Sequence, residues 1–364
     1  MRNPWLDACR ALAIALVLLG HARLFVRAAF PSLDALTAGS FLGVELFFVL
    51  SGFLIGGILL DAAAEGRPGW LRNFFARRWW RTLPNYYLFL VVNVVLALVA
   101  IRPADLTGIG AYLLFMQSLA WPHPSFFGEA WSLAIEEVFY FAFPLSFLLV
   151  ARLSGAPLAR ALLLVAVAVI LLSPLARGIF AEGGAAWDEA VRKPVAFRLD
   201  AIMYGVLLAW VARMRSSWLR PVMWQVSAFG ALAFAFWFVA TKADPALDSS
   251  SFARTWLFCV TSFGCAGLIA AGLHWPLPAA LARAAGFGAR ISYAAYLANI
   301  PVALVLLHVW PFANDGPTVQ IARAMAFLLL TVLVSWAVHR GFELRFLRLR
   351  ERLAPAPHRQ GATA

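Results

Sequence analysis

Charged residues are scarce in this chain of 364 residues, where Asp, Glu, Lys and Arg together make up only 13%. That share is about half of what a soluble domain carries, whereas the hydrophobic share of 63% exceeds the usual level. A soluble globular domain is therefore excluded, and so is a disordered chain, which needs low hydrophobicity. The apolar residues form long runs rather than short alternating segments, which argues against a β-barrel. The composition predicts an all-α polytopic membrane protein.

Cysteine and lysine are rare as well. The three cysteines, Cys9, Cys259 and Cys265, make no disulfide framework. No histidine stands near them at zinc-site spacing, so no metal site is expected. Arginine supplies nearly all of the net charge of +12, because lysine occurs only twice. These arginines lie between apolar runs, where they set topology and contact membrane lipids, so no nucleic-acid partner is expected.

Ten runs reach the length of about 20 mostly apolar residues that a spanning helix needs. They lie at 5–28, 39–60, 83–101, 130–151, 161–176, 195–213, 218–240, 254–273, 291–310 and 321–338. An eleventh run, 106–120, is shorter, and both a re-entrant and an interfacial placement stay open for it. Arginines in the segment 61–82, which includes Arg67, and in the C-terminal tail predict that both termini are cytoplasmic.

The domain organisation is correspondingly simple. Residues 1–345 are expected to form one transmembrane domain, followed by a basic and partly disordered cytoplasmic tail over 346–364. Across the boundary, the stretch 340–353 alternates Arg with Leu and Phe, which is typical of a basic interfacial helix.

Ionisable residues inside apolar runs cost at least about 2.5–3.5 kcal/mol each and are therefore candidates for function. Arg10 and His21 lie eleven residues apart, only about 20° past three full helical turns, so they share one face about 16 Å apart. Glu45, Glu136 and Glu137 are each about 9–10 Å below the outer end of their helices. The pattern predicts that these carboxylates meet His21, a candidate general base, at one depth.

Structural roles for the same residues remain the alternative. Arg10 can snorkel to the interface, His21 can be an isolated structural histidine, and the carboxylates can bond to neighbouring helices. Arg198 and Asp200 are expected to form a charge pair near the site. Asn299, two residues before Pro301, serves equally well as a link between helices or as a substrate contact.

An arginine cluster on the predicted inner side offers a second candidate site. Arg77, Arg78 and Arg81 alternate with tryptophans in a predicted loop. Guanidinium groups bind phosphates through paired hydrogen bonds, and tryptophan stacks on a nucleobase. The alternative is a juxtamembrane cluster that sets topology and binds lipid headgroups.

Taken in order, these segments resemble the membrane-bound acyltransferase family 3, which includes bacterial surface-glycan O-acetylases and macrolide-sugar acyltransferases. The resemblance rests on Arg10 with His21, and on the motifs at 43–53, 77–84, 131–140, 198–205 and 292–301. It covers residues 1 to about 345 and indicates the stand-alone form, without the periplasmic esterase-like domain of some members. Two positions depart from the pattern. Glu45 stands where Asp is common, and Asn299 stands where His is common, which argues against proton transfer there.

The resemblance implies a multi-pass enzyme of the bacterial inner membrane. It would move an acyl group, acetyl above all, from acyl-CoA as co-substrate to a hydroxyl of a sugar, glycan or glycolipid, with no permanently bound cofactor. It assigns catalysis to Arg10 and His21, with Glu45, Glu136 and Glu137 in support, and acyl-CoA binding to Arg77, Arg78 and Arg81. The acceptor side would use Trp131, Tyr140, Arg198, Asp200 and Asn299.

Several alternatives stay open at this level. Direct acyl transfer and a covalent acyl-His21 intermediate both fit the residues. A proton-coupled transporter or glycan-lipid carrier would use the same intramembrane charges, although the sequence shows no internal repeat of the kind that transporters often have. A membrane scaffold would not need so many charges at membrane depth.

Overall fold

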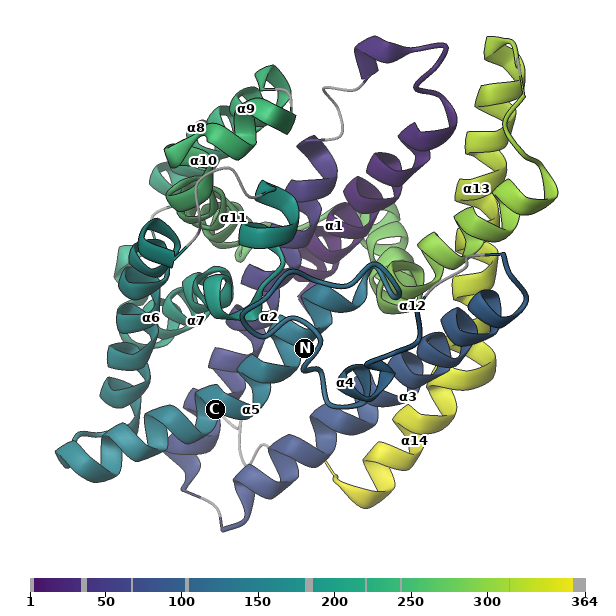
Figure 1. The fold of residues 1–364 in the computed structure, drawn as a ribbon. Coiled ribbons are helices and arrows are strands. Elements are labelled where there is room, and N and C mark those ends of the chain that lie inside the picture. Colours follow the sequence, from purple (N-terminus) through teal and green to yellow (C-terminus); the bar gives the residue numbers. More distant parts are fainter. Residues whose placement is uncertain are drawn as a thin grey trace.

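The computed structural model describes residues 3–33, 38–66, 68–101, 105–180, 186–219, 221–242, 244–313 and 315–355. Within these ranges the chain is helical and forms no strand (Figure 1). Eight helical segments are long and apolar enough to cross a membrane, which confirms the predicted all-α polytopic architecture. They are built on α1 (Pro4–Ala22), α2 (Ala38–Glu65), α3 (Trp70–Leu98), α5 (Ala130–Ser154), α6 (Leu158–Phe180), α8 (Pro221–Thr241), α12 (Ala279–Val309) and α13 (Pro317–Val338).

Two of the ten predicted spans form shorter helices. α7 (Leu199–Met214) and α11 (Leu257–Gly272) have 16 residues each. At 1.5 Å per residue each is about 24 Å long, which is less than the hydrocarbon thickness of about 30 Å. Both pack within the bundle, α7 against α2 and α6, and α11 against α8 and α2. Two one-turn helices, α9 (Asp244–Ser249) and α10 (Ser251–Thr255), precede α11.

The eleventh apolar run contains only one short helix, α4 (Ile109–Leu113). It rests on the second half of α3, where the hydroxyls of Tyr86 and Tyr87 donate to the carbonyls of Tyr112 and Leu113 at 2.8 and 2.9 Å. These bonds satisfy backbone groups that a five-residue helix leaves open.

The arginine cluster at 77–81 is helical rather than part of a loop. α3 begins at Trp70, thirteen residues before the predicted span, and continues through Pro84. Hydropathy detects only the apolar part of this helix, whereas arginine favours helix as strongly as most apolar residues do. The predicted basic helix is present as α14 (Leu344–Leu353), which follows a π-helical segment, His339–Glu343. Arg67 and residues 356–364 of the expected tail lie outside the described residues.

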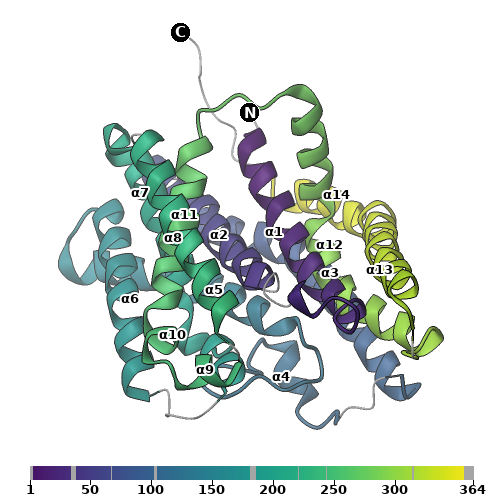
Figure 2. The ribbon, with the colours of Figure 1, turned by 90° about the horizontal axis from the view of Figure 1, so that it is seen from above.

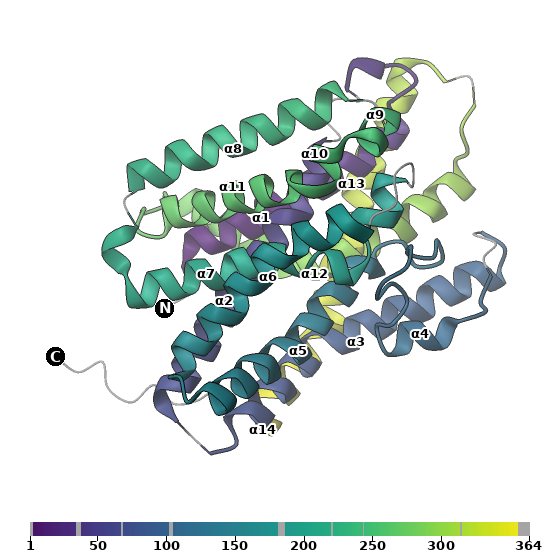
Figure 3. The same cartoon turned by 60° about the vertical axis from the view of Figure 1, so that its left-hand side comes forward.

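Segments predicted to be cytoplasmic gather at one end of the bundle (Figure 3). The side-chain amide of Asn3, before α1, donates to the carbonyl of Leu273 after α11 at 3.0 Å. Arg213 at the end of α7 pairs with Asp61 near the end of α2. Arg77 on α3 reaches the carbonyl of Ala354 after α14. This grouping agrees with the arginine bias that predicts a common side for these segments.

The centre of the bundle is α2, with α1, α5, α7 and α11 arranged around it (Figure 2). α2 and α7 touch backbone to backbone at two glycines. A methyl group on Gly52 would stand 1.8 Å from the carbonyl oxygen of Ile202, and one on Gly205 would stand 2.0 Å from that of Val49. Small residues permit such close helix packing in membranes. This contact sets the rotation of α2, which carries candidate site residues on two of its faces.

Candidate active site

A cavity of about 100 Å³ lies between α1, α2, α3, α5 and α12. Most of its wall is apolar, and the polar side chains on it include Arg10, Arg78, Arg81, Ser132, Glu136 and Tyr296. Helices that are far apart in the sequence thus contribute to one space, and several of the predicted site residues face it. A mostly apolar cavity with a few convergent polar groups is the usual form of a small-molecule site.

The wall of the cavity carries three guanidinium groups, from Arg10, Arg78 and Arg81. Arg78 and Arg81 are three residues apart on α3 and therefore share a face. Arg81 is exposed, whereas Arg78 is partly buried and lies 5.6 Å from the ring centroid of Tyr140. Arg10 bonds to Asp7 one turn earlier at 3.4 Å. The arrangement forms a positively charged entrance that reaches the protein surface.

Arg77 lies apart from this entrance, although the sequence groups it with the other two arginines. Its guanidinium group bonds to both carboxylate oxygens of Glu351, at 3.0 and 3.1 Å, and also reaches the carbonyl of Ala354. Trp80 on the same helix stacks on Phe346 at 6.3 Å between ring centroids. Arg77 therefore ties α14 to α3, while Arg78 and Arg81 line the cavity.

Glu136 faces the cavity and accepts two hydrogen bonds there. The hydroxyl of Ser51 on α2 donates to it at 2.6 Å, and that of Tyr140, one turn later on α5, donates at 3.2 Å. Glu137 points elsewhere, as expected for a residue 100° further round the helix. It is buried beside Thr82 of α3 and does not line the cavity. The adjacent carboxylates thus have separate surroundings.

Glu45 lies outside the cavity and pairs with Arg198 across α2 and α7. Neither side chain is exposed, and the guanidinium carbon of Arg198 lies 3.9 Å from the ring centroid of Phe258. Ser262 on α11 donates to the second carboxylate oxygen of Glu45 at 3.4 Å. The expected pair of Arg198 with Asp200 is therefore wrong. Arg198 is the N-cap residue of α7 and Asp200 lies in its first turn, and each finds its partner on a different neighbouring helix.

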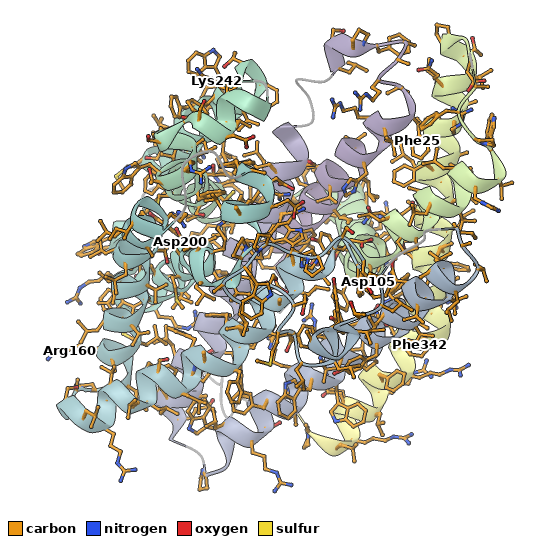
Figure 4. The ribbon with its side chains drawn as sticks, viewed as in Figure 1. Phe25, Asp105, Arg160, Asp200, Lys242 and Phe342 are labelled. Atoms are coloured by element: carbon orange, nitrogen blue, oxygen red, sulfur yellow. The ribbon has the colours of Figure 1, made fainter. Side chains whose placement is uncertain are left out.

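Asp200 instead bonds to Arg177 of α6 at 2.8 Å, and neither side chain is exposed. Figure 4 shows Asp200 among the helices, whereas Arg160 points outward from the edge of the bundle. Sequence reasoning missed Arg177 because it lies one residue beyond the predicted span 161–176. An arginine so close to an uninterrupted apolar run was the available signal.

His21 lies beyond the cavity on the same face of α1 as Arg10, and its side chain meets that of Asn299 on α12. Ser132 and Tyr296, whose hydroxyl oxygens are 2.6 Å apart, line the cavity, and the backbone carbonyl of Tyr296 accepts from the side-chain amide of Asn299. The predicted meeting of His21, Glu45 and Glu136 is thus divided in the structure. Glu136 faces the cavity, Glu45 is sealed in an ion pair, and His21 neighbours Asn299. Sequence reasoning did not identify the two hydroxyls, because isolated Ser and Tyr are common in spanning helices.

Another cation approaches this region from the segment Trp187–Arg192. The guanidinium carbon of Arg192 lies 4.6 Å from the ring centroid of Trp131, and its group pairs with Asp188. Burial works against the charge on Asp188, but Arg192 and Lys193 outweigh it and hold the pKa of Asp188 well below its usual range. Trp131 also packs edge-on against Phe48 of α2 at 5.9 Å. Trp131 therefore contacts both α2 and the segment 187–192.

Comparison with known proteins adds a decisive observation to this geometry. A family model described as an acyltransferase domain, Acyl_transf_3, matches residues 3–340. The chain belongs to this acyltransferase family. The match runs from the start of α1 into the segment after α13, so it includes every helix that lines the cavity. Membership favours an enzyme that transfers acyl groups over a transporter or a scaffold.

Relatives in the family are named as O-acetyltransferases. The chain is 35% identical over 162 residues to peptidoglycan O-acetyltransferase OatA of Listeria monocytogenes, and 31% identical over 195 residues to the putative peptidoglycan O-acetyltransferase YrhL of Bacillus subtilis. These matches cover 40% and 50% of this chain but only 24% and 29% of the relatives. O-acetyltransferase OatA of Staphylococcus aureus matches at 31% over 156 residues, covering 39% of this chain and 24% of that protein. No solved structure matches the chain.

Within this acyltransferase domain, the family motifs fall on both sides of the cavity. The motif at 77–84 supplies the positive entrance, and the motif at 131–140 supplies Ser132 and Glu136. The motif at 292–301 supplies Tyr296 and Asn299, which lead from the cavity toward His21. The motif at 43–53 contributes to two places, with Ser51 on the cavity and Glu45 in the ion pair with Arg198.

Proposed function

We propose that this protein is an O-acyltransferase of the bacterial inner membrane, which transfers an acetyl group from acetyl-CoA to a hydroxyl of a glycan acceptor. The observation that carries the proposal is the cavity with Arg10, Arg78 and Arg81 at its entrance. Arg10 on the wall of this cavity and His21 share one face of α1. A polyanionic donor and a general base thus each have a place along one path.

The donor fits the charged end of this path. Acyl-CoA carries phosphates, and guanidinium groups bind phosphate oxygens through charge-assisted hydrogen bonds. With the phosphates at Arg78 and Arg81, the pantetheine arm would extend through the apolar cavity past Arg10 and bring the thioester toward Ser132 and Tyr296. The cytoplasm supplies acyl-CoA, which agrees with the predicted cytoplasmic side of this entrance.

The acceptor would meet the thioester beside His21. The unprotonated imidazole nitrogen takes the proton of the acceptor hydroxyl while its oxygen attacks the thioester carbonyl carbon. The carbon–sulfur bond then breaks, and the CoA thiolate leaves and takes a proton from the imidazolium. Glu136 helps to orient the acyl arm from the cavity wall, and Glu137 supports α3 beside it. The buried pair of Glu45 and Arg198 holds α2 and α7 in place.

The acceptor class is inferred from the relatives. The names of two of them specify peptidoglycan O-acetylation, so the cell-wall glycan or a lipid-linked precursor of it is the first acceptor to test. The segment that carries Trp131 and the segment that carries Arg192 lie on the predicted outer side of His21. They are the surfaces against which a sugar would be oriented.

The proposal is tested with purified protein in detergent, radiolabelled acetyl-CoA and soluble peptidoglycan fragments. CoA release and labelled glycan are followed together. A general base typically contributes about 10²–10⁴-fold, so His21→Ala should lower transfer by at least that range. His274→Ala is the matched control, because His274 is exposed just after α11 and does not line the cavity.

Equal transfer by wild type and His21→Ala would end the assignment of His21. Binding of acetyl-CoA that survives replacement of both Arg78 and Arg81 would end the assignment of the donor entrance. Transfer to a different hydroxyl compound, but not to peptidoglycan fragments, would replace the acceptor and leave the acyltransferase chemistry in place.

A further inference from the structure

The side-chain amide of Asn299 has a defined orientation. Its nitrogen donates to the carbonyl of Tyr296 at 2.6 Å and to that of Ala295 at 3.3 Å, and the side chain is fully buried. Both of those neighbours are acceptors, so the nitrogen, and not the oxygen, must face the backbone of α12. The carboxylate of Glu129 accepts a hydrogen bond from the backbone N–H of Ile300, in the same turn, at 3.2 Å.

The other end of this amide, Oδ1, is buried and has no hydrogen bond of standard length from any described residue. Nδ1 of His21 is likewise buried without a hydrogen bond of standard length, although the residue as a whole is only partly buried. The side chains of His21 and Asn299 lie next to each other where α1 packs against α12. Leaving two buried polar atoms unpaired is costly, and one hydrogen bond between them would satisfy both.

An amide oxygen is only an acceptor, so the bond requires a proton on Nδ1 of the imidazole. We infer that Asn299 is a positioning residue, which holds neutral His21 as the Nδ1–H tautomer and leaves the lone pair of Nε2 for the acceptor hydroxyl. This rests on the proposed function, because it assigns a role to Asn299 through the base His21. An uncharged partner also leaves the imidazole without a counter-ion that would retain its proton.

The tautomer can be measured directly. Protein labelled with ¹⁵N-histidine is studied by NMR in detergent at a pH where the ring is neutral, and His21→Gln identifies the His21 signals. The expected spectrum shows a protonated Nδ1 and an unprotonated Nε2, the reverse of the form that free histidine favours in water. A protonated Nε2 in the wild-type protein would overturn the inference.

Two variants separate positioning from a purely structural link between helices. Asn299→Leu keeps the branched shape but removes the acceptor, so His21 should change to the Nε2–H tautomer and kcat should fall about 10-fold or more, with the KM for acetyl-CoA unchanged. Asn299→Asp keeps an oxygen acceptor and, at a pH where the ring is neutral, should keep the Nδ1–H tautomer. If Asn299→Leu unfolds, the wild-type spectrum and Asn299→Asp still decide the question.

The outcomes also distinguish this inference from the function beneath it. Suppose that a folded Asn299→Leu protein has normal kcat while His21→Ala is inactive. The positioning role of Asn299 would then be refuted, and His21 would remain the base. The opposite case is an Nδ1–H tautomer in a protein whose acyl transfer does not need His21. The contact between Asn299 and His21 would then be correct, but His21 would not be the catalytic base.

Discussion

Glu45 of α2 and Arg198, at the start of α7, form an ion pair in which neither side chain is exposed. A second sealed pair, Arg177 with Asp200, lies beside it, and both guanidinium groups stand over the ring of Phe258. The four charges come from three parts of the chain and cancel. Burying a charge is costly unless it is paired, so these pairs specify how α2, α6 and α7 assemble.

The first prediction concerns this pairing. Glu45→Gln leaves the charge of Arg198 buried without its partner and should reduce the free energy of unfolding by about 3–5 kcal/mol. Asp61→Asn removes the exposed pair with Arg213 and should cost no more than about 1 kcal/mol. Unfolding in detergent, monitored by the same signal for both variants, provides the measurement. Equal losses in the two variants would mean that the buried pair has no special stabilising role.

The second prediction concerns the contact between α2 and α7. Gly205→Ala places a methyl group 2.0 Å from the carbonyl oxygen of Val49, so the helices must separate. Overpacking of this kind costs about 1–3 kcal/mol. Gly230→Ala on α8 meets nothing within 4 Å and gains helix propensity. Thermal unfolding should therefore move down for the first variant and stay level or rise for the second, and the opposite order would refute the close approach.

The third prediction separates the clustered arginines. Arg81→Ala removes a charge-assisted bond to the donor, worth about 1.5–3 kcal/mol, so the KM for acetyl-CoA should rise about 10- to 100-fold. Arg77→Ala should change this KM much less, because its guanidinium group is engaged with Glu351. It should instead accelerate hydrogen exchange in α14. Arg160→Ala, whose side chain points away from the bundle, is the control for net charge (Figure 4). A similar rise in KM for all three variants would indicate a general effect of charge.

The fourth prediction concerns the hydroxyl pair of Ser132 and Tyr296 on the cavity wall. Tyr296→Phe removes their 2.6 Å contact and should lower kcat more than it changes the KM for acetyl-CoA, since Tyr296 is bonded through its carbonyl to Asn299, the neighbour of the base. Tyr87→Phe removes a comparable bond to the carbonyl of Leu113, outside the cavity. Steady-state kinetics of the two variants should differ in kcat. If both have wild-type kcat, the hydroxyl pair is structural.

Sequence reasoning reached most of the fold because the relevant signals are local. A run of about 20 apolar residues identifies a spanning helix without knowledge of its neighbours, and eight of the ten predicted runs have full length in the structure. The ends of a helix were harder to predict where polar residues continue it beyond the apolar run, as in α3, which begins at Trp70. The two helices of 16 residues show the same effect in reverse, because flanking apolar loop residues extend the hydropathy signal beyond the helix.

The residue types of the candidate site were also accessible from sequence, since charges within apolar runs are costly enough to be conspicuous. Their partners were not. Spacing along a helix states which residues share a face, but not which neighbour that face meets. Glu45 could be placed at the depth of His21, yet the rotation of α2 against α7, set by Gly52 and Gly205, turns it toward Arg198.

The sequence by itself therefore determined the membrane class of this protein, the course of its helices and the motifs of an acyltransferase, because hydrophobic length and residue order are properties of a single segment. Only the tertiary structure decided that Arg78 and Arg81 face the cavity while Arg77 holds α14, and that Asn299 is the neighbour of His21. These choices depend on how the helices rotate and pack against each other. That packing is determined jointly by contacts between segments hundreds of residues apart.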